Sequence, residues 1–279
     1  MTNRRTFLKA AGIGAVAAAA PSLATAAFNP SNSLKANLGF TLGVASYSLR
    51  SFPTEEALDM TLRCGIDRIT FKSMHLPLDA DKQAIEKTVA LCKTKGITLY
   101  GGGVIYMKTR EEVDQAFNYA KTAGMEMIIG VPNHELLDYV EEKVMAYNIR
   151  LAIHNHGPGD KLYPSAESAY VLIKNRDKRM GLCIDIGHTK RINRDPEQDV
   201  KDFFDRVLDI HIKDVTKAAS DGTTCIIGRG VINFPSFMKA LVKLEYKGTL
   251  ALEYEAEGKD PLPGMMESFG YVRGIMAML

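Results

Sequence analysis

The chain has 279 residues, which is long for an average domain but ordinary for a single α/β barrel of about 250 residues. Hydrophobic residues make up 46% of it and charged residues 24%, with a mean hydropathy of −0.09, and this composition excludes disordered, collagen-like and polytopic membrane proteins. The formal net charge is +2 without a basic stripe, so no nucleic-acid partner is expected.

Residues 1–26 have the features of an export signal rather than of a folded element. Arg4 and Arg5 precede the Ala-rich run 10–20, and Ala-Thr-Ala at 24–26 matches an A-x-A cleavage site. The segment resembles a twin-arginine signal peptide, so we expect a mature chain in the periplasm or otherwise exported by that route. An N-terminal membrane anchor is the alternative, but the run is shorter and less apolar than the about 18–20 residues that an anchor needs, so no stable anchor is expected.

After a linker at 27–40, residues 41–279 alternate between short β-rich runs and amphipathic helical patterns, which predicts one domain. The predicted strands lie at 43–48, 66–72, 97–105, 126–131, 149–155, 180–186, 208–213 and 249–254. The predicted helices lie at 54–64, 81–95, 110–123, 134–147, 165–175, 197–206, 234–244 and 265–278. Eight such units predict a single (β/α)8 TIM barrel, since right-handed crossovers wind a parallel sheet that eight strands can close.

A doubly wound open sheet is the alternative architecture. Such a sheet would bind a dinucleotide through GxGxxG directly after its first strand. The glycine cluster at 101–103 lies instead in the third unit and has a different spacing. The barrel is therefore favoured.

Polar side chains alternate with aliphatic ones along the last four predicted strands. His154 and His156 share one face of strand five, and Asp185, His211 and Glu253 lie on the equivalent faces of strands six, seven and eight. The bulky aliphatic residues between them are expected to pack on the helices, which leaves the polar face pointing into the barrel. All these polar residues come late in their strands, at the C-terminal mouth where barrel active sites form.

His154, Asp185, His211 and Glu253 together predict a site for one divalent metal ion. Their spacings of 31, 26 and 42 residues each correspond to one βα unit, the last with an inserted loop at 215–232. Two imidazoles and two carboxylates suit Mn, Zn, Co or Fe and leave positions open for substrate oxygens. A lone strand histidine is more often an ordinary core or mouth residue, but four inward polar groups at one height carry a large burial cost without a ligand.

Four motifs in this part of the chain point to a family. They are CIDIGH at 183–188, DIHIKD at 209–214, GRGVINF at 228–234 and LE at 252–253. Together they resemble the sugar phosphate isomerase/epimerase family, which has a xylose-isomerase-like barrel, and the resemblance covers most of residues 40–279. It implies that Asp185, His211 and Glu253 are metal ligands and that His188 hydrogen-bonds a substrate oxygen.

The chain departs from the family pattern at strand five, where His154 stands in place of a glutamate. In the family that glutamate binds the metal and also serves as an acid/base. His154 can still bind a metal, but the site loses one negative charge, which makes the metal a stronger Lewis acid. The chain also lacks one of the two carboxylates that would exchange protons on opposite faces of a carbon, so Glu253 is the main acid/base next to the metal.

Further polar residues are expected at the mouth. The predicted catalytic residues are Glu253, His188 and Lys72, and the predicted substrate contacts are His156, Lys213 and His75. Lys72 ends strand two, and its amine either enters the pocket or extends to the rim. A plain loop histidine is the alternative for His75, and pairing with an acid is the alternative for Lys213.

The predicted function is a metal-dependent sugar isomerase or epimerase that removes a proton next to a carbonyl of a carbohydrate. A lyase or hydratase that eliminates a substituent from a keto-sugar or keto-glycoside is the alternative. Two other classes remain: a sugar-binding barrel without catalysis, which needs no metal set, and an abasic-site endonuclease, which needs more metal ligands than six histidines allow and a basic groove. A phosphate ester is not expected because no Gly-rich phosphate loop is present. A homo-oligomer is left open.

Overall fold

The computed structural model describes residues 38–279, which form a closed barrel of eight parallel strands in the order β1-β10-β7-β6-β5-β4-β3-β2. The strands are β1 (Thr41–Ala45), β2 (Arg68–Phe71), β3 (Thr98–Met107), β4 (Met127–Pro132), β5 (Arg150–His154), β6 (Met180–Asp185), β7 (Val207–Ile212) and β10 (Thr249–Leu252). The predicted TIM barrel is therefore confirmed. The signal peptide predicted at 1–26 lies outside the described residues, as does most of the linker.

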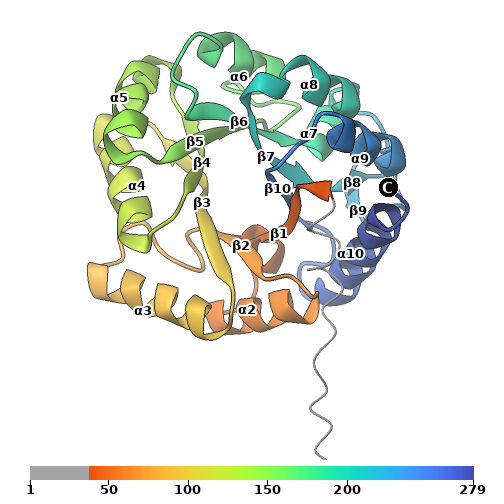
Figure 1. Cartoon of the computed structure of the whole chain (residues 1–279), viewed down its shortest axis with the longest axis horizontal. Coiled ribbons are helices and arrows are strands. Elements are labelled where there is room, and N and C mark those ends of the chain that lie inside the picture. The colour runs from red at the N-terminus through yellow and green to blue at the C-terminus, as the bar shows by residue number, and fades with distance from the viewer. Residues whose placement is uncertain (1–37) are drawn as a thin grey trace, which may run out of the picture.

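Helices surround the ring of strands, so the sheet has no exposed face (Figure 1). They are α2 (Thr54–Arg63), α3 (Lys82–Thr94), α4 (Arg110–Ala123), α5 (Leu137–Tyr147), α6 (Ala166–Ile173), α8 (Pro196–Asp202), α9 (Phe234–Lys243) and α10 (Leu262–Met276). Side-chain caps at Asp81, Thr109, Ser165, Asp195 and Asn233 begin five of them. None of the helices within residues 38–279 is long and apolar enough to cross a bilayer.

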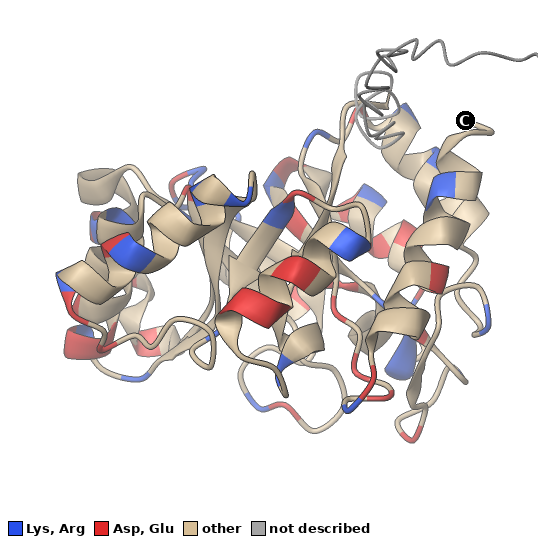
Figure 2. Cartoon of the chain, turned by 90° about the horizontal axis from the view of Figure 1, so that it is seen from below, with Lys and Arg blue, Asp and Glu red and all other residues tan. Residues whose placement is uncertain are grey.

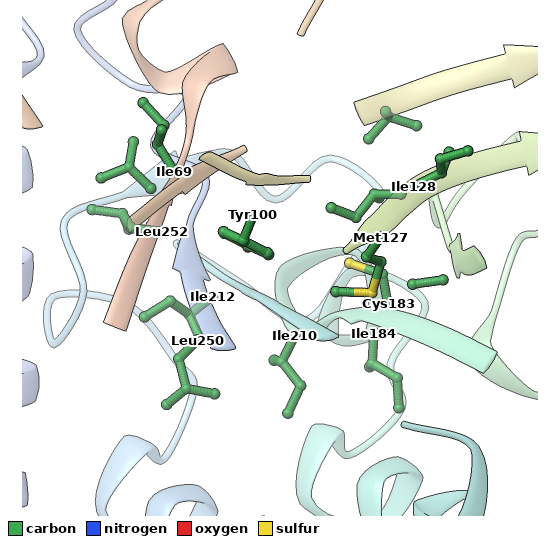
Figure 3. Close-up of a cluster of buried hydrophobic side chains, with 14 of the residues drawn as sticks. Ile69, Tyr100, Met127, Ile128, Cys183, Ile184, Ile210, Ile212, Leu250 and Leu252 are labelled. Carbon is green, nitrogen blue, oxygen red and sulfur yellow. The ribbon is translucent and has the colours of Figure 1, made fainter. Parts of the chain in front are cut away.

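The two faces of the strands carry different side chains. Outward-facing aliphatic residues pack against the helices, among them Ile69, Ile184, Ile210 and Leu250 (Figure 3). Inside the barrel, Tyr100 is fully buried, and its hydroxyl donates a hydrogen bond to Oδ2 of Asp209 at 3.1 Å. Gly43 leaves room there, since a Cβ at that position would lie 2.7 Å from Thr249 and 3.6 Å from the Tyr100 ring. This packed layer lies one step below the mouth, because Asp209 precedes His211 by two residues on β7.

Two features near the mouth differ from the prediction. Strand six was predicted to reach residue 186, but β6 ends at Asp185 and helix α7 (Ile186–Arg191) begins at once. Asp185 causes this change, because its Oδ1 accepts the backbone N–H of His188 at 2.8 Å and so caps the helix. The inserted loop after β7 contains a small antiparallel pair, β8 (Asp214–Val215) with β9 (Thr224–Cys225), which was not predicted.

Candidate active site

The four predicted metal ligands converge at the C-terminal mouth of the barrel. His154 ends β5, Asp185 ends β6, His211 lies on β7, and Glu253 directly follows β10. Asp185 is the direct neighbour of His211 in the strand register. All four side chains are buried, with Glu253 the most exposed at 6%. The strand alternation therefore brings together the residues that it predicted to meet.

Four atoms of these side chains face one small volume. Nε2 of His154 lies 3.1 Å from Nδ1 of His211, 3.5 Å from Oδ2 of Asp185 and 3.9 Å from Oε2 of Glu253. Nδ1 of His211 lies 3.5 Å from the same Glu253 oxygen. Four tetrahedral ligands at about 2.1 Å from one ion would lie about 3.4 Å from each other. These separations thus fit a single divalent ion between the four residues.

Unsatisfied hydrogen-bonding atoms support the same assignment. Within the described residues, Oδ2 of Asp185 is buried and accepts no well-aligned hydrogen bond, although the Lys213 ammonium lies 3.0 Å away, so it retains capacity for a further cation. His154 and His211 also form a triad with Cys183, whose ligand atoms lie within 4.8 Å of one another. Burial raises the pKa of Cys183 well above its ordinary value and keeps it a thiol, so the set with two carboxylates is the better metal site.

Lys213 supplies a positive charge inside this site. Its Nζ lies 2.7 Å from Oε2 of Glu253 and 3.0 Å from Oδ2 of Asp185, and it also contacts Glu255. The side chain is only 2% exposed, and it does not line the mouth cavity. The structure therefore places Lys213 in the predicted alternative role, as an ion-pair partner that holds the carboxylates together.

Burial and neighbouring charges set the protonation states. Burial lowers the pKa of His154 to about 4, so its ring is neutral at neutral pH and can offer a lone pair. Burial also opposes a charge on His211, but the nearby Glu253 outweighs it and raises the pKa. Burial alone would raise the pKa values of Asp185 and Glu253, but the Lys213 ammonium holds both below their usual range. Both carboxylates are therefore ionised.

A cavity of about 290 Å³ opens above these ligands. It is lined by Tyr47, Lys72, Val104, Tyr106, His154, His156, His188, Glu253 and Glu255. Lys72 enters it, with Nζ donating to the carbonyl of Val104 at 3.1 Å, and burial lowers the Lys72 pKa. The Tyr106 hydroxyl lies 3.1 Å from Nε2 of His156, and the two rings stack at 5.6 Å. The cavity thus combines aromatic faces with several proton carriers.

Two residues differ from the predicted cavity lining. His75 is not brought to the cavity: it is 3% exposed, and its Nδ1 lies 2.9 Å from Oγ of Ser46, which also accepts the backbone N–H of Lys72. His75 thus lies behind Lys72. Glu255 was not predicted, although it shares the strand-eight phase of Glu253 and this alternation is a signal that could have found it.

Comparison with known proteins places the chain in a family. The model of the family described as Xylose isomerase-like TIM barrel matches residues 58–275, so the chain belongs to that family. Among curated proteins, an inosose dehydratase of Salmonella typhimurium is 30% identical over 131 residues, which are 41% of this chain and 42% of that protein. A rhizopine catabolism protein of Rhizobium meliloti is 25% identical over 145 residues, 47% of this chain and 44% of the relative. These matches span less than half the length of each relative.

Solved structures show the same fold over nearly the whole barrel. An uncharacterised protein from Parabacteroides distasonis is 25% identical with a TM-score of 0.67, covering 85% of this chain and 99% of that one. An L-ribulose 3-epimerase is 16% identical with a TM-score of 0.69, covering 85% and 94%. A 3-keto-D-glucoside 4-epimerase from E. coli is 14% identical with a TM-score of 0.68, covering 84% and 99%.

Proposed function

We propose that this member of the xylose isomerase-like TIM barrel family is a metal-dependent enzyme that removes a proton next to the carbonyl of a small, uncharged keto-sugar or keto-polyol. The observation that carries the proposal is the cluster of His154, Asp185, His211 and Glu253 at the base of a cavity of about 290 Å³. A carbonyl and a neighbouring hydroxyl can reach the cluster from this cavity. Return of the proton to another position gives isomerisation or epimerisation.

The four clustered residues would hold the divalent ion, which when bound supplies Lewis-acid polarisation of the carbonyl. Glu253 is the acid/base: it is ionised and belongs to both the cluster and the cavity wall. Lys213 fixes the Glu253 carboxylate through its 2.7 Å contact, so that the base is oriented before substrate arrives. Lys72, His156 and His188 line the rest of the cavity and are the groups that can hold or donate a proton there.

The charge of the cavity supports an uncharged substrate. Two carboxylates, Glu253 and Glu255, line it together with a single lysine, Lys72. A phosphate ester would face these carboxylates, and no arginine is among the residues that line the cavity to hold its charge. Hydroxyl groups of a sugar can instead bond to the carboxylates, and Tyr47 and Tyr106 offer apolar faces to its ring.

Dehydration is the second candidate, and the replacement at strand five favours it. With His154 among the ligands, Glu253 has no matching carboxylate on the other side of the substrate for a mirror-image proton exchange. One group would remove the proton, and a different one, such as the Lys72 ammonium, would protonate a departing hydroxyl. The inosose dehydratase that matches part of this chain supports the same outcome.

The two candidates are separated by product analysis. The purified protein is incubated with Mn²⁺ and either inosose or the ketohexose D-tagatose, and the products are identified by NMR and near-ultraviolet absorbance. Epimerisation or isomerisation gives a new saturated sugar, whereas dehydration gives a product that has lost water and absorbs as a conjugated enone. A metal-dependent conversion should stop when a chelator is added. The proposal fails if no such conversion is found with these two compounds or with any other keto-sugar tested. A protein that binds these compounds unchanged would be the sugar-binding barrel instead.

A further inference from the structure

Helix α7 contains a contact between Arg191 and His188 that the proposed reaction does not yet use. Nη1 of Arg191 lies 3.3 Å from Nδ1 of the His188 ring, and the two residues are three apart on one helix face. Nη2 of the same guanidinium donates to the carbonyl oxygen of Ser220 at 2.9 Å. Ser220 lies in the connection between β8 and β9, so the inserted loop holds Arg191 against His188.

The chemistry of the two groups decides where the His188 proton lies. A guanidinium donates hydrogen bonds, accepts none and stays charged in proteins. Nδ1 of His188 must therefore accept. A neutral imidazole carries its single ring proton on one nitrogen when the other accepts, so the proton of His188 lies on Nε2.

We propose that Arg191 is a positioning residue that fixes the tautomer of His188, so that His188 presents Nε2–H to the substrate. His188 lines the mouth cavity, and its two ring nitrogens point in different directions from the ring. With Nδ1 engaged by Arg191, the neutral ring can donate to a substrate oxygen but cannot accept a proton at Nε2. The role of the donor rests on the proposed function, whereas the tautomer rests on the Arg191 contact alone.

Other contacts hold the His188 ring in place for this task. The backbone N–H of His188 donates to Oδ1 of Asp185 at 2.8 Å, which fixes the first turn of α7. The ring of His154 meets the ring of His188 nearly at a right angle, with centroids 6.0 Å apart. His188 is therefore held at its backbone and at Nδ1, with the His154 ring beside it.

His156 provides a contrast within the same cavity. Its Nε2 lies 3.1 Å from the hydroxyl of Tyr106, and a hydroxyl can either donate or accept. Its tautomer is therefore not fixed by that partner. Of these two cavity histidines, His188 is the one whose ring nitrogen faces an obligate donor. Nδ1 of His156 lies 3.7 Å from Oδ2 of Asp160, beyond hydrogen-bond distance, so that carboxylate does not fix the tautomer either. The structure thus assigns hydrogen-bond donation to His188 and assigns no single role to His156.

The tautomer can be read directly by NMR of full-length protein labelled with ¹⁵N-histidine, without substrate, in EDTA and again with Zn²⁺. The chain has six histidines, so the His188 signals can be identified by their loss in His188→Gln. We expect His188 to carry its proton on Nε2 in the wild type under both conditions. In Arg191→Met we expect a shift toward the other tautomer, while Arg191→Lys, which keeps a charged donor, should largely restore the wild-type signals.

Lys190→Met is the matched control, because it removes the neighbouring positive charge but not the donor to His188; its His188 signals should not change. Unchanged signals of the buried His75 show that each variant is folded. Protonation of Nδ1 in the wild type would overturn the proposal, as would an unchanged His188 tautomer in folded Arg191→Met. If Arg191→Met does not fold, the wild-type and Arg191→Lys spectra decide. If the tautomer is confirmed but the protein converts no keto-sugar, the proposed function is wrong and the Arg191 assignment is still supported.

Discussion

Lys213 lies almost fully buried among Asp185, Glu253 and Glu255, and its ammonium offsets part of their negative charge. His154 adds no negative charge to the set, since burial keeps its ring neutral at neutral pH. A divalent ion then brings the buried set of His154, Asp185, His211 and Glu253 to neutrality if both imidazoles are neutral. Lys213 and the ion would thus both neutralise charge on Asp185 and Glu253, Lys213 through ion pairs and the ion as a bound ligand partner.

Lys213→Met should lower the free energy of unfolding of the metal-free protein by about 3–5 kcal/mol, because it leaves buried carboxylates without their cation. Lys217→Met is the control: Lys217 pairs with Asp221 on the surface, and such exposed pairs contribute about 0–1 kcal/mol. Urea unfolding in EDTA measures both. Equal losses in the two variants would show that the Lys213 pairs are not important for stability.

His211→Ala and Asp185→Ala should each remove most of the bound metal. Each takes one ligand atom from a buried set of four, and the neighbouring Cys183 is a poor replacement because burial raises its pKa and keeps it a thiol. Metal analysis of purified wild type should give about one Mn, Zn, Co or Fe ion per chain. His134→Ala removes an exposed histidine away from the cluster and should keep the full content. Undiminished metal in both ligand variants would contradict the proposed metal site.

At the scale of elements, Asp214 organises the loop that follows β7. Its fully buried carboxylate accepts backbone N–H groups of Val215, Gly228, Gly230 and Ile232 at 2.9 to 3.2 Å. Gly230 must be glycine at this approach, since a Cβ there would lie 2.2 Å from Oδ1 of Asp214. The Asp214 side chain thereby joins the beginning of the inserted loop to its end. The β8–β9 connection of the same loop contacts Arg191 through Ser220.

Asp214→Asn should lower the free energy of unfolding by about 1.5–3 kcal/mol, since an amide presents donors of its own to these N–H groups and carries no charge. Proteolysis should then cut the loop at 226–232 faster than in the wild type. Asp221→Asn, in the same insertion but exposed, is the control for a lost carboxylate. The account of the loop is wrong if the two variants are cut at the same rate.

The sequence predicted the elements with repeating patterns and missed those made by single contacts. Alternation along four strands was enough to bring His154, Asp185, His211 and Glu253 together, because the barrel fixes which face points inward. Helix α7 is too short for a helical period and depends on the Asp185 cap. The Arg191 to His188 contact depends on this short helix, and the burial of His75 depends on a loop path, which no periodicity encodes.

In the whole molecule, the packed barrel interior and the polar cavity occupy different regions, and the cavity lies at the C-terminal ends of the strands. Lys and Arg are interspersed with Asp and Glu on the side in view, in keeping with a near-neutral chain (Figure 2). Loss of the predicted signal peptide would remove three cations and change the formal charge from +2 to −1.

Export through the twin-arginine route remains a prediction that rests on residues 1–26. In the native host, the mature protein should begin near Ala27 and should be found outside the cytoplasm. Replacing Arg4 and Arg5 together by Lys should leave the protein in the cytoplasm, folded and uncleaved. N-terminal sequencing and cell fractionation test both points. Recovery of the wild type with Met1 or Thr2 at its N-terminus would contradict the prediction.

Deuterium incorporation tests the central claim most directly, that Glu253 removes a proton next to a carbonyl above the metal cluster. The wild type and Glu253→Gln are each incubated with Mn²⁺ and the keto-sugar in D₂O, and deuterium at the carbon next to the carbonyl is followed by NMR. The metal content of the variant is measured in parallel. We predict that this carbon gains deuterium in the wild type and that Glu253→Gln reacts at least about 100-fold more slowly even where it retains metal. Conversion without any deuterium at that carbon, together with a fully active Glu253→Gln, would contradict the account.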